Sequence, residues 1–346
     1  KARPFAITIR DAAGNSSEVF ARAVIDTSGT WQTPNPLGAN GWPIEGEAEF
    51  ADRIFYGIPD ISGVAYDNYA GLRTLVLGSG HSAANVLIDL ANIAEREPAT
   101  AMTWAVRGNS LTKIFGGGSA DQLPARGALG ERLRALVDAK RLAIELSFSA
   151  QRLRKNGNGV LVDGLTPHGT RTIGPFDRIV AATGQRPDFT FAREIQLDLD
   201  PVVESSRMLG PLIDPNVHSC GTVPPHGWRE LAHAEPGFFV AGIKSYGRAP
   251  TFLLLTGYEQ VRSIAAYLAG DEAAANDVRL VLPETGVCNA TLEDVAPGAL
   301  CCDGAAPHAE DPCCARPAET QATACCSGKA QSVSPLPQPA RQAKCC

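Results

Sequence analysis

Residues 71–94 read GLRTLVLGSGHSAANVLIDLANIA, which is a buried-strand pattern followed by a glycine loop and an amphipathic helix. The sequence Thr74-Leu75-Val76-Leu77 predicts a buried strand, and apolar residues at three- and four-residue spacing predict a helix over 83–94. This order of strand, glycine loop and helix is typical of a dinucleotide-binding α/β unit. The stretch therefore predicts a nucleotide site at the start of the helix.

The loop itself has the spacing Gly78-x-Gly80-x-x-Ala83. Gly78 permits the tight turn, Gly80 lets the backbone approach a diphosphate, and the small Ala83 lets helix and strand pack closely. The free N–H groups and the dipole of the helix N-terminus attract the phosphates. A ligand-free structural junction is the alternative. The residues that we expect to contact the cofactor are Gly78, Ser79, Gly80, His81, Ser82 and Ala83.

The end of the next strand indicates which coenzyme binds. NAD sites usually place an acidic residue there, whereas NADP sites often place an arginine near the 2′-phosphate. Here the strand ends at Trp104-Ala105-Val106-Arg107 and carries no acid, so we predict NADPH, with Lys113 and Arg126 adding positive charge. The alternative is that Arg107 is an ordinary solvated surface residue.

Other strand and helix patterns flank this unit. Asn156-Gly157 predicts a hairpin turn. A Pro- and Gly-rich stretch at 32–47 reads as a surface connection. The remaining expected elements are strands at 5–10, 18–26, 142–148, 178–182 and 238–241 and a helix at 256–268.

Two further segments look like crossings between domains. Residues 177–188 read DRIVAATGQRPD, a buried strand running into a Thr183-Gly184 bend, and residues 25–36 read IDTSGTWQTPNP. With the glycine loop between them, these segments resemble the two-dinucleotide-binding flavoproteins, which include flavin monooxygenases, thioredoxin-reductase-like proteins and disulfide reductases. The resemblance covers residues 5–270. It implies that the chain binds FAD and NADPH, with Thr27, Gly29, Thr183 and Gly184 at the two crossings.

The resemblance also implies a domain organisation of the α/β class. A Rossmann-like NADPH-binding domain at 71–185 is inserted into an incomplete Rossmann-like FAD-binding domain formed by 1–70 and 186–284. The family's first glycine loop, which cradles the FAD diphosphate, would lie well upstream of Thr27 and is absent. The chain begins with Lys1, so we expect an N-terminally truncated sequence.

A third segment returns to the FAD-binding domain. Residues 236–242 read PGFFVAG, but Ile243 stands where the family has an Asp that bonds the flavin ribityl chain. The resemblance places Gly242 and Lys244 at the cofactor. Tyr246 and Arg248 either cover the flavin or its phosphates or belong to an ordinary surface loop.

The motifs do not single out a catalytic residue. Residues 53–60 lack the His of the flavin-monooxygenase signature, and residues 71–184 contain no Cys, which excludes a thioredoxin-reductase-type Cys-x-x-Cys centre there. Asn85 reads as a helix-surface residue more than a nicotinamide contact. Cys220, with His226 nearby, reads as a small buried hydrophobe more than a catalytic thiol.

Eight of the ten cysteines form adjacent pairs near the C-terminus, within a segment at 285–346 that we expect to be a disordered tail. Zinc prefers Cys-x-x-Cys spacing, so adjacent thiolates favour a soft ion such as As(III), Hg(II) or Cu(I), with Cys288 or another pair as third ligand. A neutral extension with incidental cysteines is the alternative. The paired residues are Cys301, Cys302, Cys313, Cys314, Cys325, Cys326, Cys345 and Cys346.

The composition agrees with a cytoplasmic globular protein. A formal charge of −6 argues against nucleic acid as a partner. No apolar run approaches the roughly 18 residues of a membrane helix, and the cysteines are not spread like a disulfide framework. We expect a small-molecule or metalloid substrate and allow for a homodimer.

Tail and core together resemble the flavoprotein oxidoreductases encoded beside bacterial arsenic-resistance genes. This resemblance implies an NADPH- and FAD-dependent oxidoreductase of the flavin-monooxygenase-like group in metalloid detoxification. Two alternatives stay open. One is a reductase that uses the cysteine pairs as its redox centre, and the other is a redox-inert scaffold with a metal-binding tail.

Overall fold

The computed structural model describes residues 3–116, 118, 121, 123–218 and 223–282. The chain divides into two units, Lys1–Ala290 and Thr291–Cys346. The second unit lies outside the described residues, as do Cys220 and Cys288. The prediction of a disordered tail with four cysteine pairs therefore falls outside the described part of the chain.

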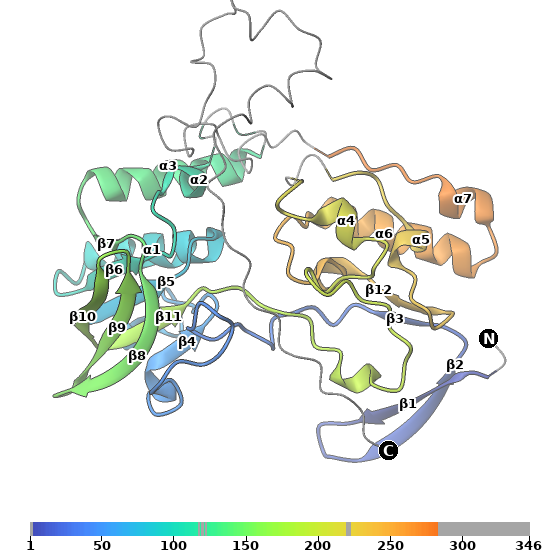
Figure 1. Cartoon of the computed structure of the whole chain (residues 1–346), viewed down its shortest axis with the longest axis horizontal. Coiled ribbons are helices and arrows are strands. Elements are labelled where there is room, and N and C mark those ends of the chain that lie inside the picture. The colour runs from blue at the N-terminus through green and yellow to red at the C-terminus, as the bar shows by residue number, and fades with distance from the viewer. Residues whose placement is uncertain (1–2, 117, 119–120, 122, 219–222, 283–346) are drawn as a thin grey trace, which may run out of the picture. The chain divides into compact units, whose positions relative to one another are not determined.

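A five-stranded parallel sheet forms the centre of the region that contains the glycine loop (Figure 1). Its central strand, Arg73–Leu77, is buried on both faces from Thr74 onward, which is why residues 75–77 are all apolar. In order across the sheet, the strands are β4 (Ile54–Tyr56), β11 (Arg178–Ala181), β5 (Arg73–Leu77), β6 (Ala101–Ala105) and β7 (Ala143–Glu145).

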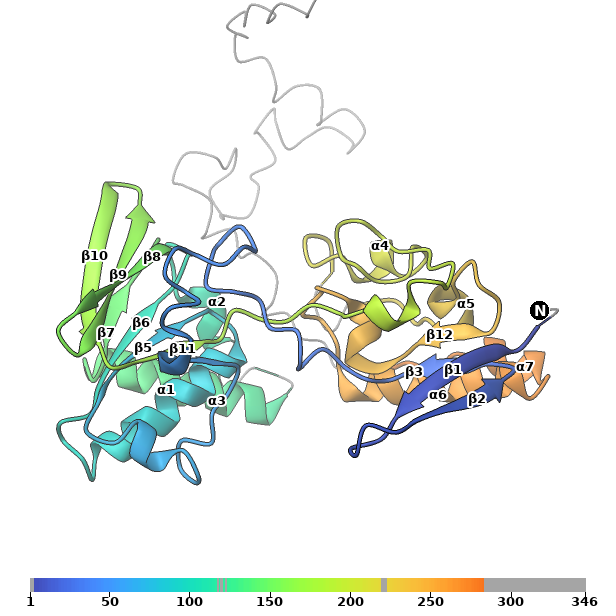
Figure 2. The same cartoon turned by 90° about the horizontal axis from the view of Figure 1, so that it is seen from below.

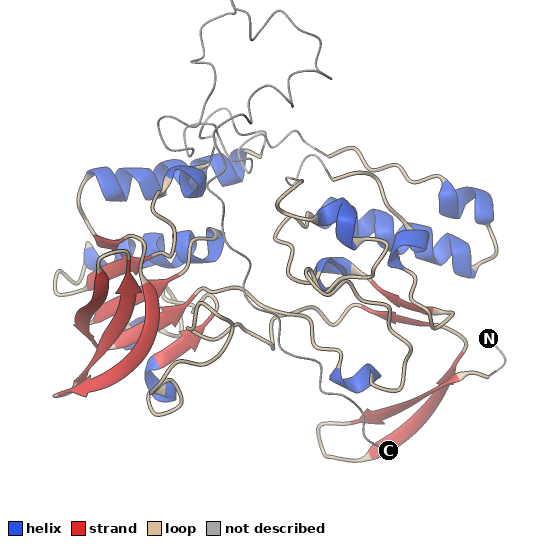
Figure 3. Ribbon diagram, viewed as in Figure 1, coloured by secondary structure: helices blue, strands red, loops and turns tan. Residues whose placement is uncertain are grey.

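Two different layers cover this sheet. Helices α1 (His81–Ala94) and α3 (Pro124–Asp138) lie on one face, and an antiparallel three-stranded sheet lies on the other (Figure 3). Successive side chains of a strand point to opposite faces, so Val76 packs under α1 while Leu75 and Leu77 pack against the three-stranded sheet. That sheet consists of β8 (Ser149–Asn156), β9 (Gly159–Thr166) and β10 (Gly169–Phe176).

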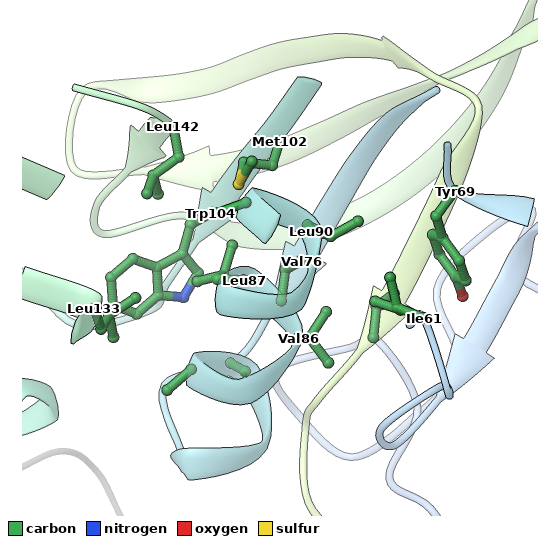
Figure 4. Packing of buried hydrophobic residues seen from close by; sticks show 14 of the residues in the cluster. Ile61, Tyr69, Val76, Val86, Leu87, Leu90, Met102, Trp104, Leu133 and Leu142 are labelled. Atoms are coloured by element: carbon green, nitrogen blue, oxygen red, sulfur yellow. The ribbon is translucent and has the colours of Figure 1, made fainter. Parts of the chain in front are cut away.

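Trp104 on β6 anchors the core beneath the helices. Its ring is fully buried and lies beside Leu87 of α1 and Leu133 of α3 (Figure 4). Its indole N–H donates to the carbonyl of Gly78, 2.8 Å away. The core residue therefore also fixes the start of the glycine loop.

The remainder of the first unit contains a smaller parallel pair, β3 (Val24–Asp26) with β12 (Phe238–Val240), and a hairpin of β1 (Phe5–Arg10) with β2 (Ser16–Ala21) (Figure 2). The prediction of one strand over 18–26 is wrong. The chain forms two strands there because β2 pairs with β1 whereas β3 pairs with β12.

The helix expected at 256–268 is confirmed, and it begins two residues earlier, at Leu254. The other helices that have not been named so far are short. No helix among the described segments combines the length and apolar character that a membrane span requires. The α-helices not yet named are α2 (Thr112–Phe115), α4 (Gly210–Ile213), α5 (Trp228–Leu231), α6 (Leu254–Leu268) and α7 (Glu272–Asn276). The 3-10 turns are η1 (Ala51–Arg53), η2 (Tyr66–Asn68), η4 (Thr190–Ala192) and η5 (Gly242–Tyr246).

Candidate functional site

A cleft of about 730 Å³ opens at the carboxyl ends of β5, β6 and β11. Parallel α/β sheets bind ligands at this edge. Its lining includes most of the predicted loop, namely Gly78, Ser79, Gly80 and Ser82, together with residues 182–186 and 247–250. The structure thus brings the glycine loop and the second crossing to one cavity.

Gly78 makes the turn out of β5 and has no room for a side chain. Its φ is +137°, in the region that favours glycine, and an added Cβ would lie 2.1 Å from the carbonyl oxygen of Ala182. The backbones of β5 and β11 therefore approach each other where only glycine fits.

Gly80 differs from Gly78 because it faces open space. An added Cβ would meet no protein atom within 4 Å. The residue caps α1 with extended backbone, φ −93° and ψ 178°, and its carbonyl accepts from the N–H of Ala84 at 3.2 Å. The first N–H groups of a helix have no intrahelical acceptor. The open cradle and these donors fit a diphosphate.

Ala83, His81 and Asn85 lie outside the main cleft. Ala83, in the first turn of α1, is fully buried against the core, as its packing role predicts. His81 lines a second cavity and not the main cleft. Desolvation, followed by the charge of nearby Arg126, lowers the pKa of His81, so its ring is neutral at pH 7. Asn85 is exposed and donates to the carbonyl of His81 at 2.9 Å.

Arg107 follows β6, lies at the main cleft and has an exposed side chain. Its Nη1 donates to the carbonyl of Ala39 at 3.1 Å. The other guanidinium N–H groups have no hydrogen-bond partner within the described part of the chain. Arg107 is therefore held in place by one nitrogen and retains donors for a phosphate.

Arg126 does not supply free positive charge to this site. Its Nε and Nη2 donate to the two carboxylate oxygens of Asp121 at 2.7 and 2.9 Å, and the Asp121 side chain is fully buried. The side chain of Lys113, the other basic residue considered, lies outside the described residues. Of the three basic residues considered, Arg107 is the one that the structure places at the cleft.

The surface connection at 32–47 contributes to the cleft, which the sequence did not indicate. Residues 35–41 line it, and Leu37 is buried. The buried carboxylate of Glu47 holds this loop by accepting from the N–H groups of Leu37 and Ile44 at 3.0 and 2.8 Å and from the Tyr56 hydroxyl at 2.6 Å. A buried glutamate in a polar loop leaves no periodic signal in the sequence.

The two predicted crossings are hydrogen-bonded to each other. The N–H of Asn35 donates to the carbonyl of Gly184, and the N–H of Arg186 donates to the carbonyl of Thr33, both at 2.9 Å. The Thr183 hydroxyl donates to the carbonyl of Asn35 at 2.8 Å, and the Asn35 amide donates back to the carbonyl of Thr183 at 3.1 Å. Asn35, which sequence reasoning missed, joins the first crossing to the second.

The glycines of the crossings lie at sharp bends. Gly29 and Gly184 have φ of +76° and +86°. Thr27 is exposed, and the neighbouring Thr30 donates from its hydroxyl to the Gln185 side chain at 3.2 Å. The predicted positions therefore lie where the chain bends, while adjacent residues make the contacts between the crossings.

Lys244 is buried and already paired. Its ammonium lies 2.6 Å from the Asp26 carboxylate and donates to the Ser28 hydroxyl at 2.9 Å, with a side chain 1% exposed. The rings of Phe189 and Phe191 lie 5.0 and 4.9 Å from the nitrogen. The prediction that Lys244 contacts cofactor stays a prediction, whereas its ammonium is engaged within the protein.

A buried polar network braces the η5 turn after β12. Gln260 accepts from the N–H of Gly242 at 2.9 Å and donates to the Ser245 hydroxyl at 2.9 Å. The Nδ1 of His226 donates to a carbonyl oxygen of Pro224 at 3.0 Å, which leaves Nε2 as an acceptor. Burial lowers the pKa of His226 and favours this neutral form.

Tyr246 lies in the core, whereas Arg248 lies at the main cleft. Tyr246 is completely buried, and its hydroxyl lies 3.4 Å from Nε2 of His226, so it is a core residue. Arg248 is exposed at the main cleft, and Ile243 also lines that cleft. Within the described residues, no three His, Cys, Asp or Glu side chains gather as a metal site.

Comparisons with known proteins support the fold. No protein-family model matches the chain, and no curated protein sequence does. Bacillithiol disulfide reductase YpdA from Bacillus cereus is similar in structure, with a TM-score of 0.56 and 16% identity over 79% of this chain and 69% of that one. The HOCl-induced flavoprotein disulfide reductase RclA from Escherichia coli has a TM-score of 0.51 and 12% identity over 80% and 51% of the two chains. DfoA from Erwinia amylovora, a cadaverine monooxygenase bound to FAD, has a TM-score of 0.50 and 14% identity over 81% and 69%.

The chain shares the fold of these three oxidoreductases. At such identities the likeness establishes the architecture, which confirms the predicted α/β fold with a Rossmann-like parallel sheet. The link to arsenic-resistance genes and the truncation stay predictions.

Proposed function

We propose that the protein is an oxidoreductase that transfers hydride from NADPH to FAD. The observation that carries this proposal is the open loop at Gly80, with the free N–H groups of α1 and with Arg107 instead of an acid after β6. The first two features fit a diphosphate, and the third fits a 2′-phosphate. The flavoprotein fold supports FAD as the acceptor.

We place FAD beside the parallel pair of β3 and β12. Gly29 and Gly242 lie just beyond the carboxyl ends of β3 and β12, and an added Cβ at Gly242 would meet no protein atom within 4 Å. Because the Lys244 ammonium is engaged by Asp26, backbone groups near these glycines are the contacts we assign to FAD. When bound, FAD supplies the hydride-accepting ring, and the protein orients it.

Changing Arg107 to Gln tests the coenzyme assignment. The variant is expected to weaken NADPH binding by about tenfold and leave NADH binding unchanged, because a charge-assisted bond to the 2′-phosphate is lost. Isothermal titration calorimetry with both coenzymes measures this. Arg132→Gln, at an exposed position of α3 outside the cleft, is the matched control. Equal losses for NADH and NADPH would contradict the assignment, and no heat with NADPH for the unaltered protein would end it.

We further propose that this oxidoreductase acts in metalloid detoxification, as a member of the flavin-monooxygenase-like group. Its support is the four adjacent cysteine pairs of the sequence, which are suited to a soft ion such as As(III). A disulfide reductase that uses the same pairs is the second candidate.

Serine replacement of the eight paired cysteines separates these candidates. In air-saturated buffer, where dioxygen accepts the electrons, arsenite is expected to accelerate NADPH oxidation by the unaltered protein at least about twofold, and the variant is expected to lose this response because capture needs thiolates. NADPH affinity should be the same in both proteins. Arsenite-independent oxidation that vanishes in the variant supports the reductase, and a rate that ignores arsenite in both proteins removes the arsenic link.

A further inference from the structure

A second cavity of about 420 Å³ lies beside the nucleotide loop. His81, the first residue of α1, lines this cavity, and Pro250 lines both this cavity and the main cleft. Its volume falls within the range of small-molecule pockets. A molecule held there would lie next to whatever the glycine loop binds.

Most of its wall is apolar. These side chains come from the start of α3 and from the segment that leads into α6, and they offer no charge to a ligand. They are Leu123, Ala125, Leu129, Pro250, Phe252 and Leu253.

The polar part of the wall carries no uncompensated charge. Arg126 is bonded through two nitrogens to the buried Asp121, so the pair is neutral overall. Desolvation and Arg126 lower the pKa of His81, which leaves its ring uncharged at pH 7. The cavity is open, with His81, Asn85 and Ala125 exposed, so a charged ligand would lose part of its hydration against the apolar wall and find no countercharge.

Two neutral groups remain to orient a ligand. The amide nitrogen of Asn85 is used in the bond to the carbonyl of His81, while its amide oxygen has no donor among the described residues. The His81 ring likewise has no hydrogen-bond partner there. An acceptor oxygen and an imidazole in an apolar wall suit a ligand with an N–H or O–H group.

We propose that this cavity binds an uncharged, mainly apolar organic molecule carrying a hydrogen-bond donor, and that this molecule is the organic substrate. The role as substrate rests on the proposed function, because it requires the coenzyme in the adjoining cleft. The binding itself does not depend on it.

Three probes of one shape test the charge preference of the cavity in the full chain. Benzamide is neutral, benzoate is anionic and benzylammonium is cationic. Benzamide is expected to bind with a Kd of about 1 mM or below and the two ions at least about tenfold more weakly, because a charge against the apolar wall loses hydration without gaining a countercharge. Ligand-observed NMR titration measures all three. Equal binding of the three probes, or no binding of benzamide, overturns the proposal.

Two alanines of α3 provide a matched pair that locates the binding. Both are exposed, but Ala125 lines the cavity and Ala128 does not. Ala125→Phe is expected to weaken benzamide binding at least about fivefold by filling the cavity, and Ala128→Phe is expected to have no effect. Equal effects of the two variants would place benzamide elsewhere and overturn the proposal.

Asn85→Asp tests the orienting group, since it keeps the shape and adds a negative charge. The preference is expected to change from benzamide to benzylammonium, and an unchanged preference counts against Asn85 as a contact. NADPH titration of Ala125→Phe should match that of the unaltered protein. Benzamide binding as described without any NADPH binding would uphold the cavity as a site and overturn its role in the proposed reaction.

Discussion

Gly78→Ala is expected to destabilise the region of the parallel sheet by about 3 kcal/mol or more. A methyl group would lie 2.1 Å from the carbonyl oxygen of Ala182, which is backbone and has little freedom to move. The φ of +137° adds strain for any residue with a side chain. Urea unfolding followed by tryptophan fluorescence measures the loss, since the buried Trp104 reports on this region.

Gly80→Ala is the matched control two residues away. Its φ of −93° suits any residue, and the methyl group would meet no protein atom within 4 Å. The free energy of unfolding is expected to stay within about 0.5 kcal/mol, while NADPH affinity falls about tenfold because the methyl group enters the cleft. A stable Gly78→Ala protein would contradict the packing argument. Undiminished NADPH affinity in Gly80→Ala would move the diphosphate away from this loop.

Lys244→Met is expected to cost about 3–5 kcal/mol of stability, because it leaves the carboxylate of Asp26 buried without its cation. The double variant Lys244→Met with Asp26→Leu is expected to regain most of that loss and to lie within about 1 kcal/mol of the unaltered protein. The rings of Phe189 and Phe191, which face the ammonium, can pack against apolar replacements. Chemical unfolding of the single and double variants gives the coupling energy.

An exposed ion pair provides the control for the expected loss of stability in Lys244→Met. Arg207 and Asp198 pair at 2.6 Å with side chains 59% and 42% exposed, so Arg207→Met is expected to change stability by under about 1 kcal/mol. If Lys244→Met is as mild as Arg207→Met, the Asp26 carboxylate does not depend on the Lys244 ammonium as its partner. The argument from burial would then fail.

The glycine loop could be predicted because its signals are local. Strand, turn and helix follow one another within 71–94, and each has its own periodicity or its own steric requirement. The same holds for the two crossings, where a buried strand runs into a glycine bend. The division of 18–26 could not be predicted, because it depends on β3 pairing with β12 more than two hundred residues later in the chain.

The polar contacts that brace the site have no local signal at all. Lys244 and Ser28 are 216 positions apart, and Asn35 and Thr183 are 148 apart. Each of these residues is unremarkable among its sequence neighbours. Only the fold brings the partners together, so a lysine expected at the cofactor is found in a buried ion pair.

The hydrogen bonds between the two crossings suggest that the region between them can be exchanged in protein engineering. The chain enters the region of the five-stranded parallel sheet after Asn35 and leaves it at Gly184, and the backbone N–H of Asn35 and the carbonyl of Gly184 are 2.9 Å apart. An insert whose ends nearly touch can be exchanged as a cassette, since the host must only supply two neighbouring attachment points. Grafting residues 36–183 as a block is then expected to transfer the proposed coenzyme preference, with the rest of the host chain left intact.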